Sequence, residues 1–108
     1  MFIAMNNFQI AAGKEQEFER IWRERETFLQ DVPGFIDFAL LRGDEAGEYI
    51  SHSVWESREV FVAWTQSESF VKGHRQASMS GIVDGPPHVK LYESVIVEHA
   101  GASATTAD

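Results

Sequence analysis

The chain has 108 residues, of which 44% are hydrophobic and 24% charged, so its composition is that of one folded domain and not of a disordered segment. It contains no cysteine, which excludes a disulfide framework, thiolate metal sites and a cysteine nucleophile. Its 9 Lys and Arg against 17 Asp and Glu give a net charge of −8, which disfavours nucleic acid and anionic membranes as partners.

The N-terminal part of the chain predicts a strand, a long helix and a second strand. Residues 2–11 are apolar and partly alternating, as expected of a strand. Residues 15–32 carry large apolar groups on one helical stripe, interrupted at Arg25, and predict a helix that ends at the Pro33-Gly34 pair. These groups are Phe18, Ile21, Trp22, Phe28, Leu29 and Val32. Residues 35–42 predict the second strand.

The C-terminal part predicts two further strands and two short helices. In chain order we expect a strand at 49–55, a helix at 58–65, a short helix from 67 to about 74, a loop at 76–87 and a strand at 88–98. Ser57 is a suitable N-cap for the first of these helices. We expect one domain over residues 1–98, followed by a disordered tail at 99–108.

The resulting order, βαββαβ, predicts an α+β fold of the ferredoxin-like type, with a four-stranded antiparallel sheet and both helices on one face. The first strand is nevertheless apolar on both of its faces. One face carries Phe2, Ala4, Phe8 and Ile10, and the other carries Ile3, Met5 and Ala11. An apolar sheet face that no helix covers needs a partner, so we expect a homodimer joined sheet to sheet.

Three residues invite a functional interpretation, and each also has a simpler structural one. His74 ends a helical segment just before a loop, where a ligand could reach it, although the helix dipole alone favours histidine there. Trp64 lies near Phe61 and Phe70, and aromatic residues at this spacing are usually core. Asn7 interrupts an apolar strand, where a buried amide satisfied by backbone is the simple explanation. Its neighbour Asn6 points the opposite way, so only one of the two can face the helices.

The chain resembles the IsdG-type haem-degrading monooxygenases, within the antibiotic-biosynthesis-monooxygenase superfamily of dimeric α/β barrels. The resemblance runs over about residues 1–98. It is carried by Met5-Asn6-Asn7, Val32-Pro33-Gly34-Phe35, Val54-Trp55-Glu56-Ser57 and the stretch from Phe61 through Ser67 and Phe70 to His74. The Pro-Gly-Phe and Trp-Glu-Ser motifs are shared by the wider superfamily. The order Asn, Trp, His is typical of the haem-degrading branch.

The resemblance implies a role for each of these residues. His74 would be the proximal ligand of haem iron, through a neutral imidazole nitrogen. Asn7 would lie on the opposite side of the ring and donate a hydrogen bond to iron-bound dioxygen. Trp64 would press on the porphyrin and ruffle it. Trp22 falls where relatives place an aromatic residue beside the haem, although packing in the helix core explains it equally well. Arg75 follows the proposed ligand and could pair with a propionate, although solvent exposure is the simpler interpretation.

The implied activity is the opening of the porphyrin ring by O₂ and the release of iron, with haem as both cofactor and substrate. Electrons would come from an external donor, expected to be an NAD(P)H-dependent reductase, because the sequence holds no identifiable flavin or nicotinamide site. No apolar run reaches the ~18 residues of a membrane helix, and the first residues lack a secretory signal, so we expect a cytoplasmic protein.

Two other functions are compatible with the same residues. The first is a cofactor-free monooxygenase of the wider superfamily that acts on a polycyclic phenol or quinol, in which His74 is a general base or only structural. The second is a haem-binding protein without catalytic activity, which would bind haem but form no bilin when reductant and oxygen are supplied.

Overall fold

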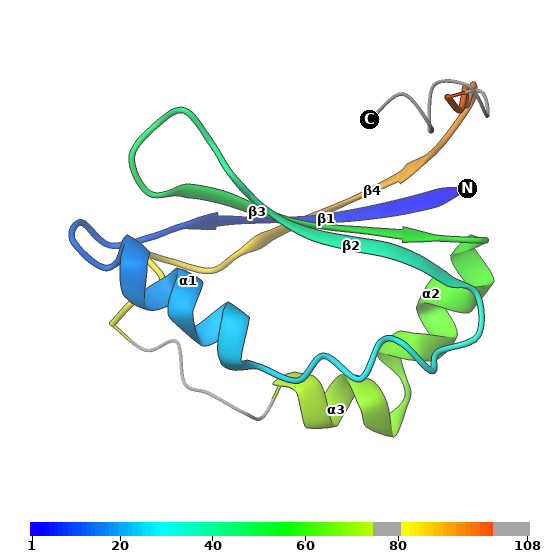
Figure 1. Ribbon diagram of the computed structural model, residues 1–108, viewed down its shortest axis with the longest axis horizontal. Coiled ribbons are helices and arrows are strands. Elements are labelled where there is room, and N and C mark those ends of the chain that lie inside the picture. Colours follow the sequence, from blue (N-terminus) through cyan, green and yellow to red (C-terminus); the bar gives the residue numbers. More distant parts are fainter. Residues whose placement is uncertain (75–80, 101–108) are drawn as a thin grey trace.

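A computed structural model of the chain describes residues 1–74 and 81–100, apart from the side chain of His74. The elements, in chain order, are β1 (Phe2–Gln9), α1 (Glu15–Glu24), β2 (Phe35–Arg42), β3 (Glu48–Trp55), α2 (Arg58–Thr65), α3 (Glu68–His74) and β4 (His88–Glu93). The strands form a 4-stranded antiparallel sheet in the order β2-β3-β1-β4. The helices lie on one face of it (Figure 1), which confirms the ferredoxin-like fold.

The helices hold the sheet through two separate aromatic clusters. Under α1, the buried residues are Ile10, Phe18, Tyr49 and Ile82. Towards α2, the buried residues are Phe2, Leu29 and Trp55. Full burial of a large apolar side chain contributes about 1.5–3 kcal/mol, so each cluster anchors its own end of the helical layer. Ser57 caps α2, as predicted, by accepting a hydrogen bond from the backbone N–H of Val60 at 3.3 Å.

The first helix is shorter than the sequence predicts. It was expected to run to residue 32, but α1 ends at Glu24, and Arg25 is extended at φ −82° and ψ 138°. Residues 25–34, which connect α1 to β2, contain no helix, and Phe28 among them has a positive φ of 58°. The physical reason is tertiary packing, because this path carries Leu29 to the second cluster, against Phe2 and Trp55, while α1 stays over the first cluster.

The first and last strands also end earlier than predicted. Strand β1 stops at Gln9, and Ile10 forms only an isolated bridge with Val83. Strand β4 stops at Glu93 and does not reach residue 98. Its partner β1 begins at Phe2, which pairs with Glu93. The Ser94 N–H still donates a hydrogen bond to the Met1 carbonyl at 2.9 Å, but later residues have no part of β1 beside them. Within the described part of the chain, no helix is long and apolar enough to cross a membrane.

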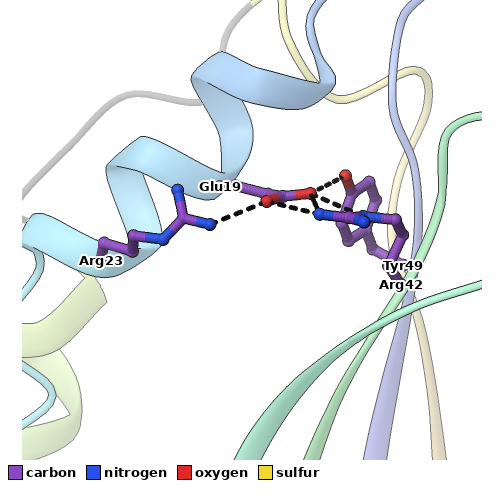
Figure 2. Close-up of polar contacts among 4 residues, drawn as sticks. All are labelled: Glu19, Arg23, Arg42 and Tyr49. Carbon is purple, nitrogen blue, oxygen red and sulfur yellow. Dashed lines mark hydrogen bonds and ion pairs between the residues drawn. The ribbon is translucent and has the colours of Figure 1, made fainter.

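Glu19 bonds α1 to the sheet (Figure 2). Arg42 of β2 donates to its carboxylate through Nε and Nη2, both at 2.9 Å, and the Tyr49 hydroxyl of β3 donates at 2.5 Å. Arg23 adds a contact from within the helix at 3.0 Å. The Tyr49 hydrogen bond, followed by those of Arg42, lowers the pKa of Glu19 below its ordinary value of 4.5. These bonds fix the position of α1 against both strands.

The Glu19 contacts predict a pH-dependent contribution to stability. Because the pKa of Glu19 is lowered in the fold, its carboxylate stabilises the protein above about pH 4.5, and this contribution is lost as the pH falls through the lower folded value. Glu19→Gln should therefore lower the urea midpoint at neutral pH and flatten the loss of stability in acid. Glu24→Gln, which removes an exposed pair with Arg20, is the control. Equal effects of the two substitutions would contradict the assignment.

Candidate functional site

On the two central strands, β1 and β3, the inner face of the sheet has small or polar side chains in its middle and aromatic side chains at both ends. In the antiparallel register, Ala4 lies opposite Ser53 and Asn6 lies opposite Ser51. The pairs that flank them on the same face are Phe2 with Trp55 and Phe8 with Tyr49. We call the four central residues the floor. Because these side chains are short, the two aromatic clusters leave a space between the floor and the helices.

This space is a cavity of about 430 Å³. Its walls are aromatic and come from all three described helices, through Trp22 of α1, Trp64 of α2 and Phe70 of α3. Trp22 is stacked on Phe38 with ring centroids 5.6 Å apart and an interplanar angle of 17°. Trp64 meets Phe70 edge to face at 4.8 Å. The cavity is therefore apolar around most of its surface and shaped for a ligand with a large apolar body.

Three buried polar atoms in the cavity residues have no hydrogen-bond partner in the described part of the chain. They are Oδ1 of Asn6, Nε1 of Trp22 and Nε of Arg25. A buried polar group left unpaired costs about 1–3 kcal/mol, so three of them among the residues of one cavity mark it as a place where the sequence is not optimised for stability alone. Arg25 is the one charged side chain among the described residues that line it, and burial lowers the pKa of its guanidinium.

The structure places the two asparagines differently from the sequence-based expectation. Asn6 lines the cavity, whereas Asn7 does not. Asn7 lies on the opposite face of β1, and its Nδ2 donates to the His88 carbonyl at 3.4 Å. The correction follows from strand parity, because the buried residues Phe2, Ala4 and Ile10 point towards the helices and Asn6 shares their parity. That parity was readable from the sequence.

The other predicted site residues are only partly described. Trp64 and Trp22 both line the cavity. His74 is the last residue of α3, but its side chain lies outside the described part of the structure, and Arg75 lies outside it altogether. Sequence reasoning missed the floor serines and Arg25. The serines carry no signal until the register of β1 and β3 is known, and Arg25 was marked only by its interruption of the apolar stripe.

Comparison with known proteins then identifies the family. The model of the family described as antibiotic biosynthesis monooxygenase matches residues 1–76. The chain belongs to this family. Relatives outside the haem branch share its fold, and SnoaB, a cofactor-independent oxygenase from Streptomyces nogalater, superposes with a TM-score of 0.68 at 21% identity, covering 89% of this chain and 94% of its own.

A haem-degrading protein is similar over nearly the whole chain. The mycobilin-producing heme oxygenase of Mycobacterium tuberculosis (strain H37Rv) is 29% identical over 108 residues, which cover 97% of each protein. The structure of the heme-degrader MhuD from Mycobacterium tuberculosis, with two hemes bound in its active site, superposes with a TM-score of 0.75 at 24% identity. That comparison covers 92% of this chain and 100% of the other.

The buried Oδ1 of Asn6, for which the described part of the chain offers no donor, predicts a substitution that does not weaken the fold. Asn6→Leu replaces a buried polar group by an apolar group of similar size, so the ligand-free protein should keep its stability or gain about 1 kcal/mol. Urea unfolding followed by circular dichroism measures this. A loss of more than about 1 kcal/mol would mean that the amide already has a partner within the protein.

Proposed function

We propose that the protein is a haem-degrading monooxygenase of the IsdG type, which takes haem as its substrate, uses O₂ to open the porphyrin ring and releases the iron. The observation that carries this proposal is the aromatic cavity over the small-residue floor, walled by Trp22, Trp64 and Phe70. The similarity of the whole chain to a mycobilin-producing heme oxygenase supports the same conclusion.

The cavity suits a flat macrocycle. A porphyrin between the floor and the helices would lie against Trp22, Trp64 and Phe70 and bury most of its apolar surface. Apolar burial contributes about 25 cal/mol per Å². Summed over the apolar area of a porphyrin, this contribution outweighs the screened repulsion between the two haem propionates and a chain of net charge −8. The floor residues, because they are short, leave room for the ring.

His74 is the proposed iron ligand. Phe70 of α3 lines the cavity, and His74 follows four residues later at the end of the same helix. Residues four apart share one face of a helix, so position 74 lies on the face that Phe70 turns towards the cavity. A neutral imidazole there would bind iron from the helix side of the ring.

Asn6 takes the role that the resemblance gave to Asn7. Its amide is on the floor, across the cavity from the helices. The oxygen and the NH₂ group exchange by a half-turn about the terminal torsion, so the amide can present either a donor or an acceptor to the sheet side of the ring.

Trp64 is proposed to set the shape of the bound ring. It is held by Trp55, with centroids 5.0 Å apart, and by Phe70 on its other side, so it resists displacement by a ligand. A porphyrin pressed against it would bend out of plane. When bound, haem supplies the redox and oxygen chemistry at its own ring, and an external donor, proposed to be an NAD(P)H-dependent reductase, supplies the electrons.

Hemin titration tests the binding step. We expect the wild-type protein to shift the Soret band at stoichiometric hemin, and mass spectrometry to show a bilin when reductant and O₂ are added. His74→Ala should lose the spectrum of the histidine complex, whereas His99→Ala, at an exposed position beyond the last strand, should keep it. A wild-type protein that shows no Soret shift and oxidises an anthrone-like phenol would instead be a cofactor-free monooxygenase. Haem binding without bilin formation would indicate a non-catalytic carrier.

The neighbouring asparagines provide a matched pair for the turnover step. Asn6→Ala should retain hemin but slow degradation at least about tenfold, because one hydrogen bond to a reacting group contributes that much or more. Asn7→Ala, on the other face of the same strand, should turn over like the wild type. Single-turnover absorbance traces measure both rates. Slower degradation in Asn7→Ala alone would restore the original assignment.

We also propose that the protein is a homodimer joined through the outer face of the sheet. No described helix covers this face (Figure 1). Its centre carries partly exposed apolar side chains on adjacent strands, namely Ile3, Met5, Ile50, Val54 and Tyr92. A second copy offers the same apolar surface, and burial of both removes the exposed patch.

Light scattering after size exclusion tests the dimer. The wild type should have twice the chain mass of 12.2 kDa, and Met5→Glu should be monomeric because it places a charge in the centre of the interface. Val62→Glu, on an exposed apolar residue of α2, should remain dimeric. A wild-type mass of one chain would overturn this part of the proposal.

A further inference from the structure

The hydroxyl of Ser53 on the cavity floor is already hydrogen-bonded within the protein. Its Oγ accepts a hydrogen bond from Nε1 of Trp55 at 2.9 Å and donates one to the Ala4 carbonyl at 3.4 Å. Ser51, the other floor serine, receives no such bond from an indole among the described residues. The one donor of the Ser53 hydroxyl and one of its two lone pairs are therefore used inside the fold, so this side chain acts on Trp55.

The bond from Trp55 to Ser53 fixes the orientation of the Trp55 ring. Trp55 is fully buried, and its ring meets Phe35 at 5.4 Å and Phe61 at 5.6 Å between centroids. The torsion that turns an indole about its own bond is broad and roughly two-fold, so apolar packing alone allows two orientations of the ring. Turned away from Ser53, the N–H would face the apolar side chains of its cluster and lose its acceptor. Ser53 therefore selects one orientation.

Trp55 in turn supports a wall of the cavity. Its ring lies against that of Trp64, with centroids 5.0 Å apart and an interplanar angle of 35°. Trp64 lines the cavity, whereas Trp55 lies behind it and is not among the described lining residues. Phe70 meets Trp64 edge to face at 4.8 Å. A rotation of Trp55 would change the surface on which Trp64 rests, so the choice made at Ser53 reaches the cavity wall.

We propose that Ser53 is a positioning residue, whose hydrogen bond to Trp55 sets the tilt of Trp64 in the cavity wall. The proposal deepens the proposed function, on which it rests for the identity of the ligand, haem. A bound porphyrin would meet Trp64, so the tilt of that indole determines how far the porphyrin bends out of plane. Loss of the Ser53 hydroxyl should therefore flatten the bound ring, although this side chain is engaged with protein and not with the ligand.

The first test needs no ligand. The chain has 3 tryptophans, and Trp55 and Trp64 are close enough for their indoles to couple, so the wild type should give an exciton couplet in its circular dichroism spectrum. Trp64→Phe identifies the couplet by removing it. Ser53→Ala and Ser53→Val should both lose the couplet. Ser53→Thr should keep it, because threonine has the branched shape of valine and retains the hydroxyl. An unchanged couplet in the two variants without a hydroxyl overturns the proposal.

Two controls keep this test independent of folding. Ser51→Ala removes the same hydroxyl from the neighbouring floor position and should leave the couplet unchanged. In the wild type, nuclear magnetic resonance should show a nuclear Overhauser effect between the Trp55 indole proton and the β-protons of Ser53. Absence of this effect would overturn the proposal without any substitution.

The second test uses hemin and resonance Raman spectroscopy. The wild-type complex should show out-of-plane porphyrin modes, which should weaken in Ser53→Val and persist in Ser53→Thr. In a Trp64→Phe background, Ser53→Val should have no further effect, because Ser53 acts through Trp64. Equal modes in Ser53→Val and Ser53→Thr, or a further loss in the Trp64→Phe background, would overturn the effect on the ring.

The two tests separate this proposal from the proposed function. A wild-type protein that binds no hemin but has a couplet dependent on the Ser53 hydroxyl would keep the positioning role and reject the haem function. Hemin binding and bilin formation, with a couplet and Raman modes that do not respond to the hydroxyl, would keep the haem function and reject the positioning role.

Discussion

The structure depends on a break in side-chain size along two paired strands. Phe2 with Trp55 and Phe8 with Tyr49 supply aromatic bulk at the two ends of the inner sheet face, whereas the floor between them is made of short side chains. The helices pack on the bulky ends and cannot descend onto the floor. A cavity is the necessary result, because no other described side chain fills the space between the clusters.

The helical layer is arranged around this cavity. Glu19 fixes α1 to β2 and β3, so Trp22, one turn further on, meets Phe38 and forms a wall. The early end of α1 then turns Arg25 onto that wall. The buried polar atoms of Asn6, Trp22 and Arg25 that lack a partner in the described part of the chain reduce the stability of the protein, and such local violations are expected near functional sites.

Much of this fold could be predicted from the sequence. The order of elements and the cap of α2 follow from local patterns, and the bounds of β2 agree with the prediction. The excess helix after Glu24 arose because Leu29 and Val32 continue the apolar stripe, although they belong to a different core cluster. Local periodicity cannot distinguish one core from two. The predicted strand beyond Glu93 failed for a similar reason, because its composition suits a strand but β1 offers no residues to pair with.

The site was only partly predictable. Trp64 and Trp22, which the resemblance singled out, both line the cavity. The choice of Asn7 over Asn6 followed the resemblance, whereas strand parity predicts which of the two side chains lines the cavity. Ser51 and Ser53 acquire meaning only when β3 is aligned with β1, a long-range relation that no local pattern contains.

The most direct test of the central claim is a hemin titration of Ser51→Phe. A phenyl ring at this position would fill the floor opposite Asn6 without disturbing either aromatic cluster. If the short floor creates the binding site, the variant should fold with an unchanged circular dichroism spectrum and lose hemin affinity by about 100-fold or more. A variant that folds and still gives the wild-type Soret titration would show that haem does not occupy this cavity.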